Sequence, residues 1–360
     1  MKLPCITMLA TLLLTVPAAA QLQITPPATT PSAPPEKQKA RPPAPAKKKE
    51  AAPAPKPSAS PKPSPSSKPT PTPTVIPAPP SDNSGADLVY GAYQRGQYKT
   101  AFDLATARAQ TGDAKAMTML GELYSNAMGI RRDYAKAAEW YKRAADAGDR
   151  EAMFALAMLR ISGRGGSLDK GEAVKLMASA AKLGEPKAAY NLALLYLDGQ
   201  TLPQDVRRSA ELLRQAADAG LPEAQYALAT FYKEGTGVPK DPERAVRLLQ
   251  AASLADNVDA EVEYAIAMFN GTGTPKNQPA AVALLRKASR QGSAIAQNRL
   301  AWVLINGVGT PVDKIEGFKW HLVAKTAGKG DLELDKQLSD LPAEDRAKVE
   351  AAAKKWLGSK

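Results

Sequence analysis

Apolar residues recur along most of the chain with the spacing of one helix face. Ala188, Leu192, Leu195 and Tyr196 show the pattern: they stand at i, i+4, i+7 and i+8, with polar residues between them. This is the period of an amphipathic α-helix. Glycine or proline follows each such stretch before the pattern resumes. The sequence therefore predicts a series of short helices joined by turns.

The helical pattern itself repeats every 36 residues. We count positions in each unit from its first residue, position 0, which is Gly112 in the first unit. Alanine fills position +4 in all six units (Ala116, Ala152, Ala188, Ala224, Ala260, Ala296) and position +32 in all six (Ala144, Ala180, Ala216, Ala252, Ala288, Ala324). Such self-similarity is typical of helical repeat proteins. We predict six repeats, at residues 112–147, 148–183, 184–219, 220–255, 256–291 and 292–327.

Each unit contains the signals for two helices. The first follows a capping residue at +1, such as Asp149, and ends near +15, where five units have glycine. Ala127 stands there in the first unit, so we expect a different turn. The second helix follows Asp or Asn at +21, and Asp169 with Glu172 predicts a capping box. We expect Leu or Trp at +28 to join the +32 alanines in the buried seam.

A single helix pair of this kind buries its apolar face only against neighbouring pairs, which predicts a stacked, all-α solenoid of antiparallel helix pairs. The stack needs polar ends to stay soluble. Residues 85–111 are a shortened unit that predicts an N-terminal capping helix pair. Residues 329–360 predict C-terminal capping helices with a charged outer face.

The N-terminal part has a different composition. Residues 21–84 hold 20 of the 31 prolines and contribute +6 of the net charge of +12. So few of these residues are apolar that we expect a disordered, extended Pro/Lys/Ala/Ser-rich linker. Its positive charge suits an anionic polymer of the cell wall.

Residues 1–20 read as a signal peptide. Lys2 is followed by a short apolar run that ends near Val16, and then by Ala18, Ala19 and Ala20. We expect cleavage after Ala20 and a periplasmic or secreted protein that is not transmembrane; an uncleaved anchor is the alternative. Cleavage would remove the chain's one cysteine.

With these residues in view, the chain resembles the Sel-one-like repeats, relatives of the tetratricopeptide repeats. The fourth unit carries the resemblance most closely, from Ala224 through the turn Tyr232–Asp241 to Ala252. The resemblance implies a right-handed superhelix that acts as a protein-interaction scaffold. Exported bacterial members of the family are often adaptors or regulators of envelope signalling. A cysteine-rich branch of the family departs from this sequence, whose repeats lack cysteine, so we do not carry its activity over.

The repeats offer little catalytic chemistry. The chain has one histidine, His321, and nucleophilic or zinc sites need a base or several His and Cys ligands. Because His321 follows Trp320 where other units have Tyr141 or Met177, we interpret it as a packing residue. Gly-Thr-Gly at Gly235–Gly237 recurs in phase with the helix turn and lacks the rest of a phosphate loop. We therefore expect no enzyme activity, no metal and no cofactor.

A protein or peptide is the expected partner, and export makes nucleic acid an unexpected one. The resemblance places the first helix of each pair on the concave side, where +6, +10 and +13 share one face. These positions vary between units and are unusually apolar, as a partner-binding surface would be. The alternative is packing against adjacent helices. The candidate residues are Phe154, Met158, Ile161, Tyr190, Leu194, Leu197, Tyr226, Ile266, Phe269, Trp302 and Ile305.

Overall fold

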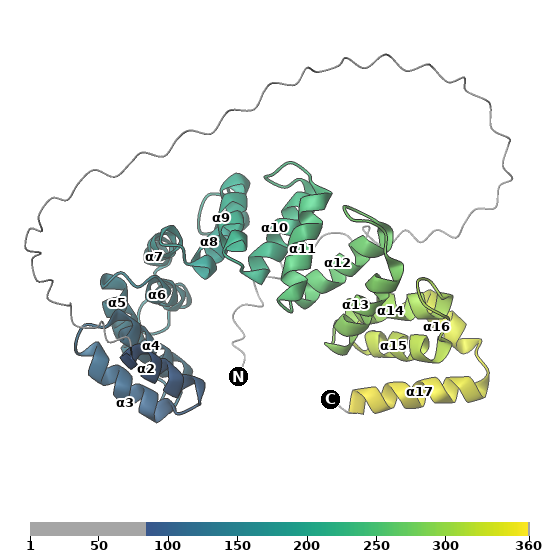
Figure 1. Ribbon diagram of the computed structural model, residues 1–360, viewed down its shortest axis with the longest axis horizontal. Helices are drawn as coiled ribbons and strands as arrows, with labels where there is room; N and C mark the ends of the chain where they lie inside the picture. The colour runs from purple at the N-terminus through teal and green to yellow at the C-terminus, as the bar shows by residue number, and fades with distance from the viewer. Residues whose placement is uncertain (1–83, 359–360) are drawn as a thin grey trace, which may run out of the picture. The chain divides into compact units, whose positions relative to one another are not determined.

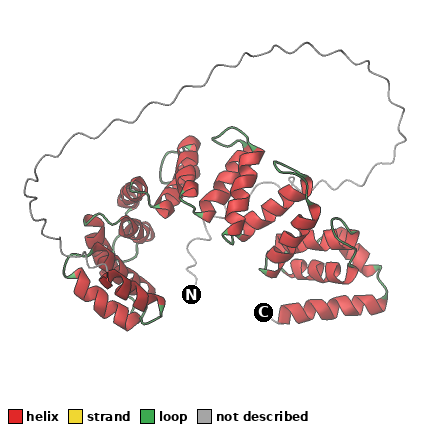
Figure 2. Ribbon diagram, in the orientation of Figure 1, coloured by secondary structure: helices red, strands yellow, loops and turns green. Residues whose placement is uncertain are grey.

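The computed structural model describes residues 84–358, and it describes the side chains from Leu88 onward. The predicted signal peptide and almost all of the predicted linker lie outside these residues. Across the part that is described, all regular structure is helical and short loops join the helices (Figure 2). The expectation of an all-α repeat of antiparallel helix pairs is confirmed.

Each repeat contributes two helices of 13 residues, which we call its A-helix and its B-helix. The A-helices are α4 (Ala114–Asn126), α6 (Arg150–Ser162), α8 (Pro186–Asp198), α10 (Pro222–Glu234), α12 (Val258–Asn270) and α14 (Ala294–Asn306). The B-helices are α5 (Tyr134–Asp146), α7 (Lys170–Lys182), α9 (Val206–Asp218), α11 (Pro242–Leu254), α13 (Gln278–Arg290) and α15 (Lys314–Thr326). Figure 1 shows them in chain order.

Helices of the same kind also meet between repeats. From α4 to α15 each helix packs against the next one along the chain. Lys233 of α10 lies 3.1 Å from Glu263 of α12, which links two A-helices. Arg286 of α13 lies 2.7 Å from Glu316 of α15, which links two B-helices. The stack therefore has two layers, an A layer and a B layer.

The ends of the stack are built from additional helices. Before the first repeat, α2 (Ser84–Gln94) packs on α3 (Tyr98–Ala109), which packs on α4. After the last repeat come the short α16 (Leu332–Ser339) and α17 (Ala343–Gly358). Helix α17 lies against α15, and the rings of Trp356 and Trp320 meet edge to face with centroids 5.0 Å apart. The last B-helix is thus covered.

The capping residues seen in the sequence begin the helices as expected. The Asp149 carboxylate accepts a hydrogen bond of 2.8 Å from the backbone N–H of Ala152, and the Asp241 carboxylate accepts one of 2.9 Å from Arg244. Each bond satisfies a backbone donor that the first helical turn leaves without a partner.

Two local expectations are wrong. Ala127 adopts the same left-handed conformation as the glycines at +15, with φ of 56°, so the first repeat has no special turn there. The capping box at Asp169 is only half formed. Asp169 accepts from the backbone of Glu172, but the Glu172 carboxylate pairs with Arg160 of α6 at 2.8 Å. The Asp169 N–H that would complete the box donates instead to the Arg160 carbonyl at 3.0 Å, so the Glu172 carboxylate pairs with the Arg160 guanidinium.

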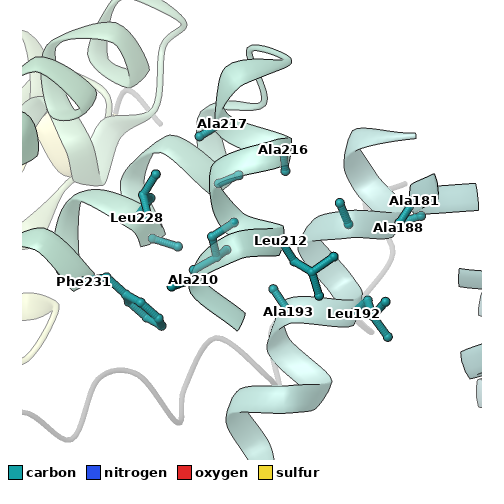
Figure 3. Packing of buried hydrophobic residues seen from close by; sticks show 14 of the residues in the cluster. Ala181, Ala188, Leu192, Ala193, Ala210, Leu212, Ala216, Ala217, Leu228 and Phe231 are labelled. Carbon is teal, nitrogen blue, oxygen red and sulfur yellow. The ribbon is translucent and has the colours of Figure 1, made fainter. Parts of the chain in front are cut away.

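The core lies between the layers and is built largely from alanine. All six +32 alanines are 0 % exposed, and Figure 3 shows Leu212 of α9 beside Leu192 and Ala193 of α8, where the two helices meet. The fully buried large residue of the B-helix is at +29, as in Met177 and Leu213, rather than at +28. Position +28 is 100° further around the helix, so four of its six residues are only half-buried.

Candidate partner-binding surface

The sequence-predicted residues lie on one side of the A-helices, and most are half-buried. Nine of the eleven keep part of their side chains exposed. The other two, Phe269 and Ile305, are 6 % exposed. Ile305 is covered because Gly317 of α15 has no side chain: a Cβ there would lie 2.6 Å from Ile305 Cγ1. Phe269 and Ile305 therefore belong to the packing of the stack, as the alternative interpretation had it.

The apolar part of this surface is concentrated on α6, α8 and α10. Six of the predicted residues pack with one side against the central core cluster while staying half-exposed: Phe154, Met158, Ile161, Tyr190, Leu197 and Tyr226. We call these six residues and Leu194 the A-face stripe. Their packing fixes the side chains, so a partner would meet a preformed surface.

Polar residues bound the stripe on both sides. In the first repeat the same positions hold Thr118, Glu122 and Ser125, and the Tyr93 hydroxyl donates a 2.7 Å hydrogen bond to Glu122. In the fourth repeat Lys233 occupies +13 and pairs with Glu263. The stripe therefore covers the second to fourth repeats. Beyond it Ile266 and Trp302 stay half-exposed at +10, but each stands apart because Phe269 and Ile305 beside them are buried.

Carboxylates lie around the two tyrosines of the stripe. Burial raises the pKa of the Tyr226 hydroxyl, and the charges of Glu263, Asp259 and Glu234 raise it further. Burial, and then the charge of Glu223, raises the pKa of Tyr190 in the same way. Both phenols are therefore neutral at physiological pH and can donate hydrogen bonds to a partner.

Two surface hollows lie away from the stripe. One, of about 630 Å³, is lined by α4 and α5, including Tyr124 and Trp140, whose ring carries the Arg143 guanidinium at 4.9 Å. The other lies between α11 and α12 beside Tyr264. Sequence reasoning did not single out either. Trp140 was the available signal, because four of the other five repeats have leucine at that position.

A buried charge in the fifth repeat also escaped the sequence analysis. The Glu261 side chain is 0 % exposed, and its Oε2 lies 3.0 Å from Nζ of Lys287, which also lies 3.2 Å from Asp256. In the repeats on either side, glutamine occupies this position. Gln225 and Gln297 donate from Nε2 to the carbonyls of Ala217 and Ser289 at 3.3 Å and 3.1 Å. A carboxylate cannot donate such a bond, so Glu261 depends on Lys287.

The histidine and the Gly-Thr-Gly turn singled out in the sequence have structural roles. His321 is fully buried at +29, and its Nε2 lies 2.8 Å from Asp335 Oδ1, so it holds α16 against α15. Gly237, in the Gly-Thr-Gly turn, lies against the backbone of Val206 in the preceding repeat. Residues 84–358 contain no group of three His, Cys, Asp or Glu placed to hold a metal ion. None of the helices described has the length and hydrophobicity needed to cross a membrane.

Comparison with known proteins decides the family. Six consecutive units match the Sel1 repeat, at residues 114–149, 150–185, 186–221, 222–257, 258–293 and 294–329. The chain belongs to the Sel1 repeat family. Each matched Sel1 unit begins two residues after the boundary drawn from the sequence pattern, at the start of the A-helix itself.

Two solved structures show the same fold. A protective antigen of uropathogenic Escherichia coli with an SLR fold has 25 % identity and a TM-score of 0.66, covering 77 % of this chain and 61 % of its own. This Sel1-repeat chain thus spans less than two thirds of that antigen. A Sel1 repeat protein from Oxalobacter formigenes has 24 % identity and a TM-score of 0.57, covering 67 % of this chain and 96 % of its own. A search of curated proteins gives no match.

Proposed function

We propose that this Sel1-repeat protein is a non-catalytic adaptor of the bacterial envelope that holds a protein or peptide on its A-face stripe. The observation that carries the proposal is the contrast between two sets of positions in the same helices. The +4 and +32 alanines are invariant between repeats and buried, whereas the seven residues of the A-face stripe differ between repeats and stay half-exposed. Packing alone does not require the apolar residues of the stripe to face solvent.

Location in the envelope rests on residues 1–20, whose short apolar run and Ala18–Ala20 are typical of a signal peptide. Regulation of a signalling system is the role that the family resemblance favours for an exported member. An alternative function is a structural spacer whose basic linker, residues 21–84, contacts cell-wall material. That function predicts that deleting the linker abolishes retention on isolated cell walls, whereas the adaptor would keep its partner.

The first experiment identifies the partner. A photoreactive amino acid in place of Leu194, within the stripe, should crosslink one protein in cells. The matched site is Gln250, which is exposed on B-helix α11. Crosslinks of equal yield to the same protein from both sites would contradict binding on the A-face stripe.

The second experiment separates binding from packing. Tyr190→Ala with Tyr226→Ala should abolish capture of the crosslinked partner. The control is Tyr196→Ala with Tyr264→Ala, because these tyrosines are also half-buried and pack on the same cluster, but lie at +12 and +8 on the other side of the helix. Both pairs should lower the melting temperature similarly. If both pairs also lose the partner equally, the tyrosines of the stripe act through stability alone.

A further inference from the structure

The two layers of the stack carry opposite charge. The B-helices contain 17 Lys and Arg against 7 Asp and Glu, a net charge of +10, whereas the A-helices contain 6 against 8. Five of the six B-helix N-caps and three of the six A-helix N-caps are acidic. When the N-caps are included, the B layer has a net charge of +5 and the A layer a net charge of −5. The sequence read linearly hides this separation, because A- and B-helices alternate along it.

Ion pairs inside the stack do not remove this difference in charge between the layers. Four of the seven acidic residues of the B-helices pair with cations of the same layer, and Glu172 pairs with Arg160. Among the residues described, eight exposed B-layer cations have no ion pair: Arg143, which lies over the Trp140 ring, and Lys170, Lys175, Lys182, Arg207, Arg214, Arg290 and Lys314. The exposed acidic residues of the layer without an ion pair are Glu139 and Asp218 within the helices and Asp169, Asp205 and Asp313 at the N-caps, five against eight cations. The B layer thus presents uncompensated positive charge to solvent.

The densest part of this charge lies on α7 and α9. These helices touch, since the Gln215 side chain of α9 donates to the Ala181 carbonyl of α7. Lys175 and Lys182 are seven residues apart on α7, as are Arg207 and Arg214 on α9, so each pair points in nearly one direction from its helix. We call these four residues the B-face cations. Their charges are spread over two helices and are not gathered in a pocket.

The chemistry of the B layer distinguishes among anionic partners. Helices α7, α9, α11 and α13 contain no aromatic residue, so they offer no ring on which the bases of a single strand could stack. Leu254 of α11 is 82 % exposed at +34, the position that Lys182 and Arg290 hold in other repeats. A lipid bilayer has phosphate groups at its surface and hydrocarbon beneath them. The row of cations suits the phosphates, and the exposed leucine suits the hydrocarbon.

We propose that the B layer docks on an anionic phospholipid surface through the B-face cations and the neighbouring B-helices. Each cation near such a surface contributes electrostatic attraction that salt weakens. The opposite charge of the layers orients the molecule: the B layer faces the lipid, and the A layer, with its stripe, faces away. This inference does not depend on the identity of the peptide partner.

The test is binding of the full chain to vesicles that contain phosphatidylglycerol and phosphatidylcholine at 3:7, measured by co-sedimentation. Lys175→Gln with Lys182→Gln should weaken binding about 25-fold, on the basis of about fivefold per cation. The matched control is Lys187→Gln with Lys233→Gln, which removes two lysines from A-helices and should change binding less than about twofold. Vesicles of phosphatidylcholine alone should not bind the chain.

The linker of residues 21–84 is present in every variant, so its own attraction to the vesicles cancels in the comparison. Equal binding by the two lysine pairs would assign vesicle binding to the linker and overturn the proposal. A 20-base-pair DNA duplex is the second probe. If the Lys175/Lys182 variant loses duplex binding but not vesicle binding, the B layer recognises nucleic acid and the lipid assignment is wrong.

Discussion

Two of the residues that depart from the repeat are compensated by a second residue that they contact. Gly121 occupies a position where the other five repeats have alanine, and Tyr141 of α5 occupies the buried +29 position where four repeats have methionine or leucine. A Cβ on Gly121 would lie 2.5 Å from the Tyr141 ring, closer than carbon atoms can approach. The missing methyl group therefore makes room for the ring.

Gly121→Ala should destabilise the protein by about 1–3 kcal/mol, because the added methyl overpacks the junction of α4 and α5. Tyr141→Leu alone should also destabilise it, since a cavity replaces part of the ring. Combined, the two changes recreate the alanine and leucine found in other repeats, so the double variant should lose less than the sum. Urea unfolding of all four proteins measures this; strictly additive losses would show that the two residues do not compensate each other.

Glu261 and Lys287 form a second such pair, and here the compensation is electrostatic. Lys287→Ala would leave the Glu261 carboxylate buried without a cation, which should cost about 1–3 kcal/mol; Lys287 is itself partly exposed, so solvent screens the pair. Glu261→Gln should instead raise stability by about 1 kcal/mol, because the amide can donate to the Ser253 carbonyl as Gln225 and Gln297 do in their repeats.

In the Glu261→Gln background, Lys287→Ala should cost less than about 0.5 kcal/mol, because no buried charge remains. Chemical denaturation of the four proteins forms a double-mutant cycle. An unchanged cost of Lys287→Ala in that background would mean that the lysine stabilises the repeat through Asp256 or through packing, and not through Glu261.

At the scale of helices, capping residues at the N-terminus and left-handed residues at the C-terminus of the A-helices set where these elements begin and end. The sequence was sufficient to locate the caps, the helix pairs and the invariant alanine columns, because these depend on residues a few positions apart. It was not sufficient to decide between +28 and +29, which lie side by side on the helix and differ only in what the neighbouring repeat brings against them. The pairing of Glu172 with Arg160 likewise depends on contact between two helices.

The alanine seam gives a test of this register. Ala252→Leu should destabilise the protein by about 1–3 kcal/mol, because Ala252 is fully buried where helices meet. Ala283→Leu is the matched control: the same substitution on the neighbouring B-helix, at an exposed position, should cost less than about 0.5 kcal/mol. Thermal and urea unfolding compare the two; similar losses would contradict the assignment of +32 to the seam.

At the scale of the whole molecule, the candidate surfaces could be predicted only in part. The A-face stripe was visible in the sequence as variable apolar positions, but its limits were not: Phe269 and Ile305 fit the same pattern and are buried. The charge of the B layer could not be recognised before the helices were sorted into layers. The limits of the stripe and the charge of the B layer both depend on which side chains a neighbouring repeat leaves exposed, and this requires the three-dimensional structure.

The uniform junction between repeats has an evolutionary and practical consequence. Because α8 and α10 both bury alanine, leucine and alanine at +4, +8 and +9, residues 184–219 could be excised and α7 would meet α10 through the same three positions by which it now meets α8. The shortened protein should remain helical and unfold at a lower temperature, having lost one interface of the stack; circular dichroism would reveal a collapse of helix content if the junctions were not interchangeable. Repeats can thus be gained or lost in whole units of 36 residues, and each such change lengthens or shortens the A layer and the B layer together.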